Sequence, residues 1–372
     1  MTASLPASVG QRLAEVDTPA LILDLDAFER NIASLQAALK GLDIRVRTHA
    51  KTHKCPEIAL RQIAAGAVGV CCQKVSEAEA MVDGGVRDVL VSNQIVGERK
   101  LARLARLAKR ARIGICVDDA LQISALSEAA AREGAQIDVY VEIDVGARRC
   151  GVAPGAPALA LAQHIVVAQG LRFAGLQAYQ GSAQHIRTIL ERRARIEVAI
   201  EAARVTRALI ESHGIACPIV TGAGSGSFMF EAASGVYDEL QPGSYIFMDA
   251  DYGRNEWAPP LPHFEHALFV LATVMSRAVP GFAVLDAGLK ASSVDSGLPL
   301  VWQRPGLDFV RISDEHGVIE IQSGVMPPEL GDKLLLVPGH CDPTVNLHDW
   351  YVCVRGGVVE ALWPITARGA TA

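Results

Sequence analysis

RIGICVDDALQISALSEAAAREGAQIDVYVEIDVG, residues 112–146, contains two short apolar runs of strand type, 112–117 and 137–146, on either side of an alanine-rich stretch. Such an order predicts a strand, an amphipathic helix and a second strand. Two strands joined through a helix lie parallel in one sheet, and the crossover between them is right-handed. The stretch therefore predicts one unit of a parallel α/β fold.

The same unit recurs along the first two-thirds of the chain. Aliphatic residues recur at three- and four-residue intervals in the longest helical stretch, residues 188–214, and Gly214 is placed to end it. Eight strand–helix units predict a closed (β/α)₈ TIM-type barrel. The eight candidate strands are residues 44–50, 68–73, 88–93, 112–117, 137–146, 172–179, 218–224 and 239–247.

The pattern changes after about Trp257, where strand-like runs are separated by Gly, Pro and Asp and no long helix follows. This predicts a second, all-β domain. The early strand-like segment 18–26 precedes the barrel strands and is expected to pair with that domain. We therefore predict a barrel over residues 25–255, and a β domain formed by residues 1–24 together with 256–372.

Composition restricts the class of protein. The chain has 372 residues and a net charge of 35 − 41 = −6, which argues against a nucleic-acid partner. No apolar run reaches membrane-spanning length, and the N-terminus lacks the pattern of a signal peptide. The eight cysteines form no compact framework, so reduced thiols and a cytoplasmic location are expected.

RTHAKTHK, residues 47–54, places cations at the end of the first predicted barrel strand. Active sites of such barrels lie at the carboxyl ends of the strands. A lysine that is desolvated there, close to other cations, has a lowered pKa and can form a Schiff base with a carbonyl. Lys51 is therefore a candidate reactive amine. A solvated rim lysine, or a clamp for a substrate carboxylate, is the alternative.

TGAGSGS, residues 221–227, follows the seventh predicted strand, where barrels of this kind bind phosphate. Small residues let backbone N–H groups approach a phosphate closely, and the hydroxyls of Thr221, Ser225 and Ser227 add donors. A plain turn is the alternative. A phosphate site and a reactive lysine at one barrel mouth together predict pyridoxal phosphate as cofactor and an amino acid as substrate.

GHCDP, residues 339–343, contains a histidine and an aspartate two residues apart. In an extended segment, His340 and Asp342 would face the same side and could bind one ion, while Cys341 would point away and pack. Mixed nitrogen and oxygen ligands suit Mn²⁺ or Mg²⁺ better than Zn²⁺. Incidental surface polarity is the alternative.

Several motifs, taken in order, resemble the D-threonine aldolase family: HAKTHK, CCQKVSEAE, GARRCGV, LQAYQGS, TGAGSGS, ELQPGSYIFMDADY and VPGHCDPTVNLHDWYV. The resemblance extends from about Asp17 to Gly369. It implies an alanine racemase-like barrel of the type III pyridoxal-phosphate fold, with a C-terminal β domain shared with D-serine dehydratase-like proteins. It also implies a homodimer.

The resemblance also assigns roles to residues of this chain. Lys51 matches the lysine that carries the cofactor, Arg149 the arginine near its phenolic oxygen, and Tyr179 the residue that packs on its ring. His340 and Asp342 match the metal ligands. The matches at the phosphate end are Gly222, Gly224, Ser225, Ser244 and Tyr245, beside which Thr221 was predicted from the loop itself.

The implied reaction is retro-aldol cleavage of a D-3-hydroxy amino acid to glycine and an aldehyde. The metal would acidify the substrate's β-hydroxyl, and a metal-bound hydroxide or a nearby histidine would take its proton. His53 is the histidine candidate for this catalytic role. His185, at a barrel mouth, and Asp286, Lys290 and Asp295 are possible neighbours of the site.

Other functions remain open at this stage. A 3-hydroxyaspartate aldolase would need a cation for the second carboxylate, which Arg254 or Arg304 could supply. A D-serine or 3-hydroxyaspartate dehydratase is a further alternative, but those relatives carry His-x-Cys with zinc where this chain has His340 and Asp342. An amino-acid racemase would need no metal, and a cofactor carrier would need no β domain.

Overall fold

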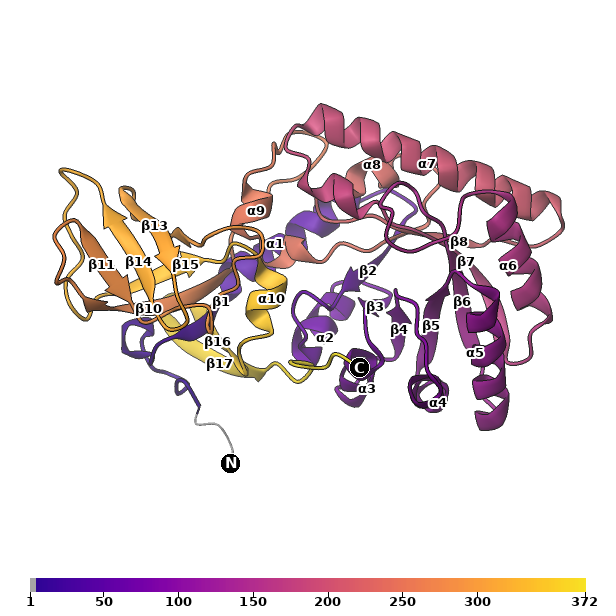
Figure 1. The fold of residues 1–372 in the computed structure, drawn as a ribbon, viewed down its shortest axis with the longest axis horizontal. Helices are drawn as coiled ribbons and strands as arrows, with labels where there is room; N and C mark the ends of the chain where they lie inside the picture. The colour runs from indigo at the N-terminus through magenta and orange to yellow at the C-terminus, as the bar shows by residue number, and fades with distance from the viewer. Residues whose placement is uncertain (1–4) are drawn as a thin grey trace.

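The computed structural model describes residues 5–372, which form two lobes (Figure 1). In one lobe, eight parallel strands close into a barrel, with β9 pairing both β8 and β2. The predicted (β/α)₈ barrel is therefore confirmed. Its strands are β2 (Arg45–His49), β3 (Gly69–Cys72), β4 (Asp88–Val91), β5 (Arg112–Val117), β6 (Ile137–Glu142), β7 (Leu171–Ala178), β8 (Ile219–Gly222) and β9 (Glu239–Leu240).

Helices surround the barrel, and the longest, α7 (Ile189–Ser212), runs along its outer face (Figure 1). Among the described residues, no helix is long and apolar enough to cross a membrane. All eight cysteines are free. The other helices of this lobe are α1 (Leu25–Leu39), α2 (Pro56–Ala64), α3 (Val75–Asp83), α4 (Glu98–Leu107), α5 (Ala120–Glu133), α6 (Ala156–Val167), α8 (Phe228–Ala232) and α9 (Ala250–Gly253), with the 3₁₀ turns η2 (Gly181–His185) and η3 (Ser244–Ile246).

The second lobe is a nine-stranded sheet. The early segment joins it as expected, because β1 (Ala20–Asp24) pairs antiparallel with β10 (Leu268–Ser276) and parallel with β16 (Trp350–Arg355). The remaining strands are β11 (Phe282–Leu285), β12 (Leu300–Val301), β13 (Leu307–Ile312), β14 (Gly317–Ile321), β15 (Lys333–Val337) and β17 (Val358–Pro364), with the 3₁₀ turn η1 (Leu13–Glu15) and the short helix α10 (Cys341–Val345).

Two predicted strands are shorter than expected. The expectation of a strand over 239–247 was wrong, because β9 has two residues and the chain then turns through Pro242, which has no N–H to donate, into η3. The expectation of a strand to residue 146 also fails, because β6 ends at Glu142. Beyond that strand, the Asp144 carboxylate accepts from Gly146 N at 2.9 Å and from Arg148 N at 3.0 Å, which forms a turn.

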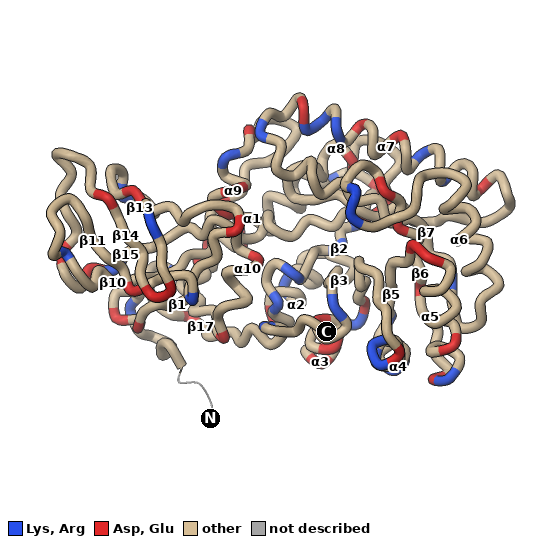
Figure 2. The backbone as a smooth tube through the Cα atoms, in the orientation of Figure 1, with Lys and Arg blue, Asp and Glu red and all other residues tan. Residues whose placement is uncertain are grey.

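The two lobes are joined at several places next to the barrel mouth. The Tyr351 hydroxyl of β16 donates to the His53 carbonyl oxygen at 2.7 Å. The C-terminal segment returns to α3, where Ser76 N donates to Ala372 O at 2.9 Å (Figure 1). The domain limits at 24/25 and 255/256 remain predictions. In Figure 2, acidic and basic residues are interspersed over both lobes.

The barrel interior contains one charged network near the seam where β2 meets β9. The side chain of Arg47 is 4% exposed; its Nε lies 2.9 Å from Glu239 Oε1 and its Nη1 lies 2.7 Å from Asp88 Oδ1. Glu239 is fully buried. Asp88 also pairs with Arg112, but Glu239 has Arg47 as its cation, so loss of the guanidinium would leave the Glu239 carboxylate uncompensated inside the barrel.

The substitution Arg47→Met is expected to lower the free energy of unfolding by about 3–5 kcal/mol, the range for breaking a buried ion pair from one side. Urea titration followed by circular dichroism measures this change. In the control Arg110→Met, the lost pair with Asp83 is more than half exposed on both sides, so a change below ~1 kcal/mol is expected. Equal effects of the two substitutions would contradict a role for the seam network.

Candidate active site

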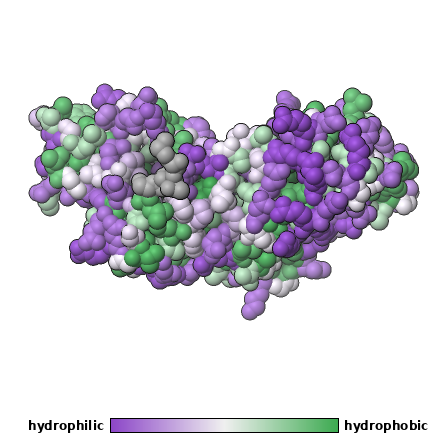
Figure 3. All heavy atoms as spheres, turned by 90° about the horizontal axis from the view of Figure 1, so that it is seen from below, coloured by the Kyte–Doolittle hydropathy of each residue, from purple (hydrophilic) through white to green (hydrophobic). Residues whose placement is uncertain are grey.

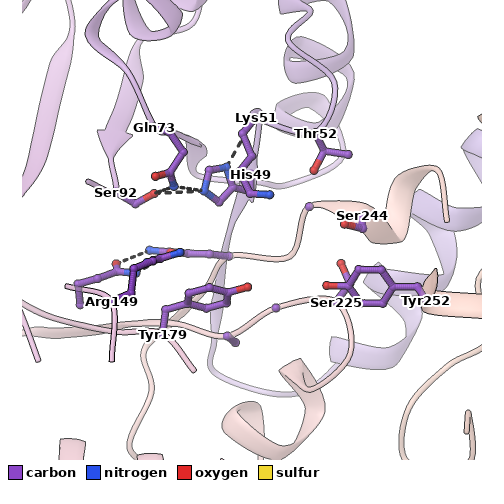
Figure 4. A pocket seen from close by; sticks show the side chains of 15 residues that line it. His49, Lys51, Thr52, Gln73, Ser92, Arg149, Tyr179, Ser225, Ser244 and Tyr252 are labelled. Atoms are coloured by element: carbon purple, nitrogen blue, oxygen red, sulfur yellow. Dashed lines mark hydrogen bonds between the residues drawn. The ribbon is translucent and has the colours of Figure 1, made fainter. Parts of the chain in front are cut away.

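The carboxyl ends of the barrel strands surround a cavity of about 290 Å³ (Figure 4). His49, Gln73 and Ser92 gather at one end, Arg149 lies beside Tyr179, and Ser225, Ser244 and Tyr252 stand at the other end. The cavity therefore contains two cations, Lys51 and Arg149, and has a hydroxyl-rich end. The lining residues are His49, Lys51, Thr52, Gln73, Ser92, Arg149, Gln177, Tyr179, Ala223, Gly224, Ser225, Gln241, Gly243, Ser244 and Tyr252.

Lys51 lies in the turn that follows β2, and its side chain is 38% exposed. Its ammonium contacts Oδ2 of Asp342, which belongs to the other lobe. Burial lowers the pKa of Lys51, but the Asp342 carboxylate raises it, and the net direction is upward. The expectation of a lowered lysine pKa is therefore wrong for this state of the protein, because a carboxylate distant in sequence becomes the lysine's nearest charge.

His49 lines the cavity two residues before Lys51, although the sequence analysis gave it no role. Its Nε2 lies 2.9 Å from Gln73 Nε2 and 3.2 Å from Ser92 Oγ, which come from the ends of the next two barrel strands. Burial lowers the pKa of His49 well below its ordinary value, and the nearby Lys51 acts in the same direction. His49 could have been recognised from the sequence, because it lies at the end of the predicted strand, two residues before Lys51.

Arg149 and Tyr179 lie together at the cavity wall. The Arg149 guanidinium carbon is 5.7 Å from the centroid of the Tyr179 ring, a distance that favours a cation–π contact. The nearest carboxylate oxygen to Arg149, Glu142 Oε1, is 4.0 Å away and makes only a weak pair with it. Its guanidinium therefore remains available to an anionic ligand oxygen.

The structure separates the six residues predicted for the phosphate end. Gly224, Ser225 and Ser244 line the cavity, whereas Thr221, Gly222 and Tyr245 do not. Thr221 lies inside the barrel, where its hydroxyl donates to Glu239 Oε1 at 3.0 Å. Gly222 is the last residue of β8, and the Tyr245 hydroxyl is buried against Gln62 Nε2 at 3.0 Å. The prediction therefore included residues that support the loop but lie behind it.

Gly224 packs closely against the side chain of Gln184. A Cβ atom built on it would lie 2.5 Å from Gln184 Oε1, so the position has no room for a side chain. Gln184 in turn accepts from Gly226 N at 2.9 Å and donates to Ser227 Oγ at 2.8 Å. Ser225 Oγ accepts from Tyr245 N at 2.9 Å, which joins the loop to the turn that carries Ser244.

A buried carboxyl group stands behind the same loop. Glu231 of α8 is 1% exposed, and its Oε1 accepts from Ser227 Oγ at 2.9 Å, while its Oε2 has no hydrogen-bond partner. Burial raises the pKa of Glu231 to about 7, although the Ser227 hydroxyl opposes that shift. Sequence reasoning missed this residue because a glutamate in a helix gives no sign of its burial.

His53 is fully buried and does not line the cavity. Its Nδ1 accepts from Cys55 N at 3.1 Å, and its Nε2 has no hydrogen-bond partner. Burial lowers the pKa of His53 to about 3, so the imidazole is neutral and only weakly basic. Neither its position nor its basicity supports the predicted catalytic role, because the chain turns after Lys51 and buries this side chain outside the cavity lining.

His340 and Asp342 lie next to one another, with 4.0 Å between His340 Nε2 and Asp342 Oδ2. The expectation of an extended segment was wrong, since His340 caps α10 and Asp342 lies in its first turn. Cys341 packs as expected, with its Sγ directed to Met248 O at 3.6 Å. Asp342 Oδ1 is buried without a hydrogen-bond partner, which is the state expected of an oxygen that binds a cation.

The charges around Asp342 keep it ionised. Burial would raise the pKa of this carboxyl, but Lys51 and His340 outweigh burial and lower it to about 2. In the part of the chain that the structure describes, no group of three or more histidine, cysteine, aspartate or glutamate side chains is placed to hold a metal ion. A metal bound here would therefore have two protein ligands and would take the rest from water or substrate, as Mg²⁺ and ions like it commonly do.

The loop that carries this pair is fixed to the barrel lobe by three hydrogen bonds. Ala250 N donates to Pro338 O at 2.9 Å, and Asp251 N donates to Gly339 O at 3.3 Å. The buried Asp249 carboxylate accepts from Cys341 N at 3.1 Å. These contacts determine where His340 and Asp342 stand relative to the cavity.

A histidine that is paired with an aspartate lies beside the cavity. His185 Nδ1 lies 2.6 Å from Asp251 Oδ2, and its side chain is 53% exposed. Its ring is 6.0 Å from the ring of Tyr252, which lines the cavity. Arg187 also binds Asp251, with 2.5 Å between Nη2 and Oδ1. The earlier suggestion of a site role for His185 is thus consistent with its place beside the cavity and the metal-pair loop.

Comparisons with known proteins cover both lobes. Residues 23–251 match the alanine racemase N-terminal domain family, and residues 267–354 match a putative serine dehydratase domain. A D-threonine aldolase from Arthrobacter sp is 54% identical over 98% of this chain and 96% of its own length. A 3-hydroxy-D-aspartate aldolase from Paracoccus denitrificans (strain Pd 1222) is 49% identical over 98% and 95%. The crystal structure of D-threonine aldolase from Filomicrobium marinum superposes with a TM-score of 0.98, at 55% identity, covering 99% of this chain and 100% of that chain.

Glu231 should make the stability of the protein without cofactor depend on pH. Its pKa is about 7 in the folded protein and near 4.5 when unfolded, so only the folded state holds the proton between those values. Stability from this group is thus present below pH 4.5 and lost as pH rises to 7, by about 3 kcal/mol at ~1.4 kcal/mol per pKa unit. Glu231→Gln should remove this dependence in urea titrations at pH 5 and pH 8.

The control for this experiment is Glu197→Gln, which changes a carboxylate on α7 that is 57% exposed. This variant should retain the pH dependence of the wild-type protein. A pH profile for Glu231→Gln that parallels the wild-type profile would show that Glu231 titrates normally.

Proposed function

Because this chain belongs to the D-threonine aldolase family, in which an alanine racemase-like barrel precedes a D-serine dehydratase-like domain, we propose that it cleaves D-3-hydroxy amino acids to glycine and an aldehyde. The proposed cofactors are pyridoxal phosphate, which the family implies, and a divalent metal. The observation that carries the proposal is the contact between Lys51 and Asp342. It brings the candidate cofactor lysine, which lines the cavity, against a candidate metal ligand of the β domain.

The residues of the cavity fit pyridoxal phosphate. Lys51 would hold the aldehyde end, and Arg149 and Tyr179 would meet the ring. Gly224, Ser225 and Ser244 would bind the phosphate, because hydroxyls and the backbone of small residues can donate to it there. When bound, pyridoxal phosphate supplies a ring that accepts the electron pair left on Cα as the Cα–Cβ bond breaks.

His340 and Asp342 fit a hard divalent ion, for which we favour Mn²⁺ or Mg²⁺ over Zn²⁺. The unpartnered Asp342 Oδ1 supports this assignment. A divalent ion at this place supplies a positive charge that lowers the pKa of the substrate's β-hydroxyl. The neighbouring Cys341 is buried with its Sγ 3.6 Å from Met248 O, so it packs in the core and is not offered as a thiolate ligand of the kind found in the dehydratase alternative.

We place the base that takes the β-hydroxyl proton at His185 rather than His53. Asp251 binds His185 Nδ1, which leaves Nε2 free to accept a proton. Asp251 also joins the loop of the metal pair through its backbone N–H. The base and the metal ligands are thus held by one segment, which favours their action on one hydroxyl group.

A 3-hydroxyaspartate substrate is the second candidate, supported by the 49% identical relative that is named for this activity. Arg254 would be the cation for the additional carboxylate. Its Nη2 already donates to Ser296 O at 2.8 Å and its Nε to Ala250 O at 3.2 Å, which reduces its freedom to bind substrate. Arg304 is not among the cavity residues. Glyoxylate release from 3-hydroxyaspartate faster than acetaldehyde release from D-threonine would favour this candidate.

We further propose a cytoplasmic homodimer, as the family resemblance implies. Exposed apolar side chains on the β domain support a subunit interface there: Val279 is 60% exposed, Leu330 69% and Met326 82%. Apolar residues appear among polar ones on both lobes in Figure 3. A second copy of the chain could cover part of this surface.

Replacing Lys51 by alanine tests the proposed cofactor attachment. Lys51→Ala should lack the absorbance of the bound cofactor and should lose aldehyde release from D-threonine, because the ring that accepts the electron pair is no longer held. Lys109→Ala, which removes an exposed lysine after the end of α4, should leave both properties unchanged. If Lys51→Ala retained both the cofactor absorbance and aldehyde release, the proposed function would be wrong.

Metal removal tests the other half of the site. After chelation and dialysis, the protein should keep its cofactor absorbance but lose aldehyde release, because the β-hydroxyl is no longer acidified. Adding Mn²⁺ should restore the activity, and Zn²⁺ should restore less of it. Undiminished activity in protein that contains less than one metal per ten chains, measured by atomic absorption, would refute a metal requirement.

A further inference from the structure

The loop between β11 and β12 contacts the metal-pair histidine on the side opposite Asp342. Asp295 Oδ2 lies 2.7 Å from His340 Nδ1, whereas Asp342 faces the other ring nitrogen, Nε2. Ser293 Oγ donates to Asp295 Oδ1 at 2.9 Å, and Ser296 Oγ donates to Asp295 Oδ2 at 3.2 Å. Both oxygens of the Asp295 carboxylate are therefore held in place while one of them binds the imidazole.

The same loop is attached to its surroundings at both ends. Ser293 N donates to Thr344 Oγ1 at 3.1 Å, and that hydroxyl donates to His340 O at 2.8 Å. At the other end, the barrel residue Arg254 donates to Ser296 O at 2.8 Å. Asp295 thus stands on a segment that is anchored to α10 and to the barrel, although its own side chain is 49% exposed.

A carboxylate that accepts from Nδ1–H leaves Nε2 of a neutral imidazole as the lone-pair nitrogen and limits rotation of the ring. It also makes the imidazole a stronger ligand. We propose that Asp295 is a positioning residue for the divalent metal, which directs His340 Nε2 toward the ion and increases its affinity. This inference rests on the metal site proposed above, and Asp295 itself does not touch the ion.

The experiment measures Mn²⁺ binding directly, by equilibrium dialysis and by electron paramagnetic resonance of the free ion. Asp295→Asn retains the shape of the side chain and removes its charge, and Asp295→Ala removes the contact. Both variants should bind Mn²⁺ about 10–100-fold more weakly, the usual effect of losing such a partner. Asp308→Asn is the matched control, because that β-domain carboxylate accepts from Gln322 Nε2 at 2.7 Å.

Enzyme assays separate positioning from catalysis. In Asp295→Asn, the Mn²⁺ concentration for half-maximal activity should rise by the same factor as the Kd, while kcat at saturating Mn²⁺ stays within about threefold of the wild-type value and cofactor absorbance is unchanged. A normal Mn²⁺ Kd in both Asp295 variants would overturn the inference, even if their melting temperatures fell. If Asp295→Ala does not fold, the isosteric Asp295→Asn still decides.

His340→Ala distinguishes failure of this inference from failure of the metal site itself. Loss of stoichiometric Mn²⁺ binding in His340→Ala, together with weakened binding in Asp295→Asn, supports both proposals. Loss in His340→Ala with wild-type affinity in Asp295→Asn overturns only the role of Asp295. Wild-type Mn²⁺ binding in His340→Ala overturns the metal site and, with it, this inference.

Discussion

The contact between the Lys51 ammonium and the Asp342 carboxylate is the interaction on which the site depends. Lys51 follows β2 of the barrel, and Asp342 follows β15 of the β domain. Neither lobe alone contains both groups. Each charge is partly removed from water, and each stabilises the ionised form of the other. The cavity is lined by barrel residues, and this contact brings a carboxylate of the β domain against its lysine.

Hydrogen bonds between the lobes help to maintain their orientation. The segment after η3 donates to the carbonyl oxygens of Pro338 and Gly339, and the Asp249 carboxylate receives the N–H of Cys341. Burial raises the pKa of Asp249 to about 6, yet its two backbone donors stabilise the ionised form. These bonds hold the loop of His340 and Asp342 close to the barrel mouth. A metal and a cofactor that act on one substrate must be held close together in this way.

The phosphate end shows how far sequence reasoning reaches. A glycine- and serine-rich loop after the seventh barrel strand was recognisable, and Gly224 and Ser225 do line the cavity. Thr221 and Gly222 belong to the same motif but lie in β8, and Tyr245 points into the core. The motif covers one turn of chain, and only half of the side chains on such a turn can face one cavity. Glu231 and Gln184, which support the loop from behind, belong to no motif.

The sequence by itself determined the number and order of the strand–helix units, the presence of an all-β second domain and the position of Lys51 at a strand end. These features depend on local periodicity, which the chain records directly. Only the tertiary structure decided that His53 is buried, that Asp342 is the nearest charge to Lys51 and that Asp295 binds His340. Those contacts join residues 45 to 291 positions apart or depend on the direction of a turn, and a side chain's pKa and orientation follow from such neighbours rather than from its own segment.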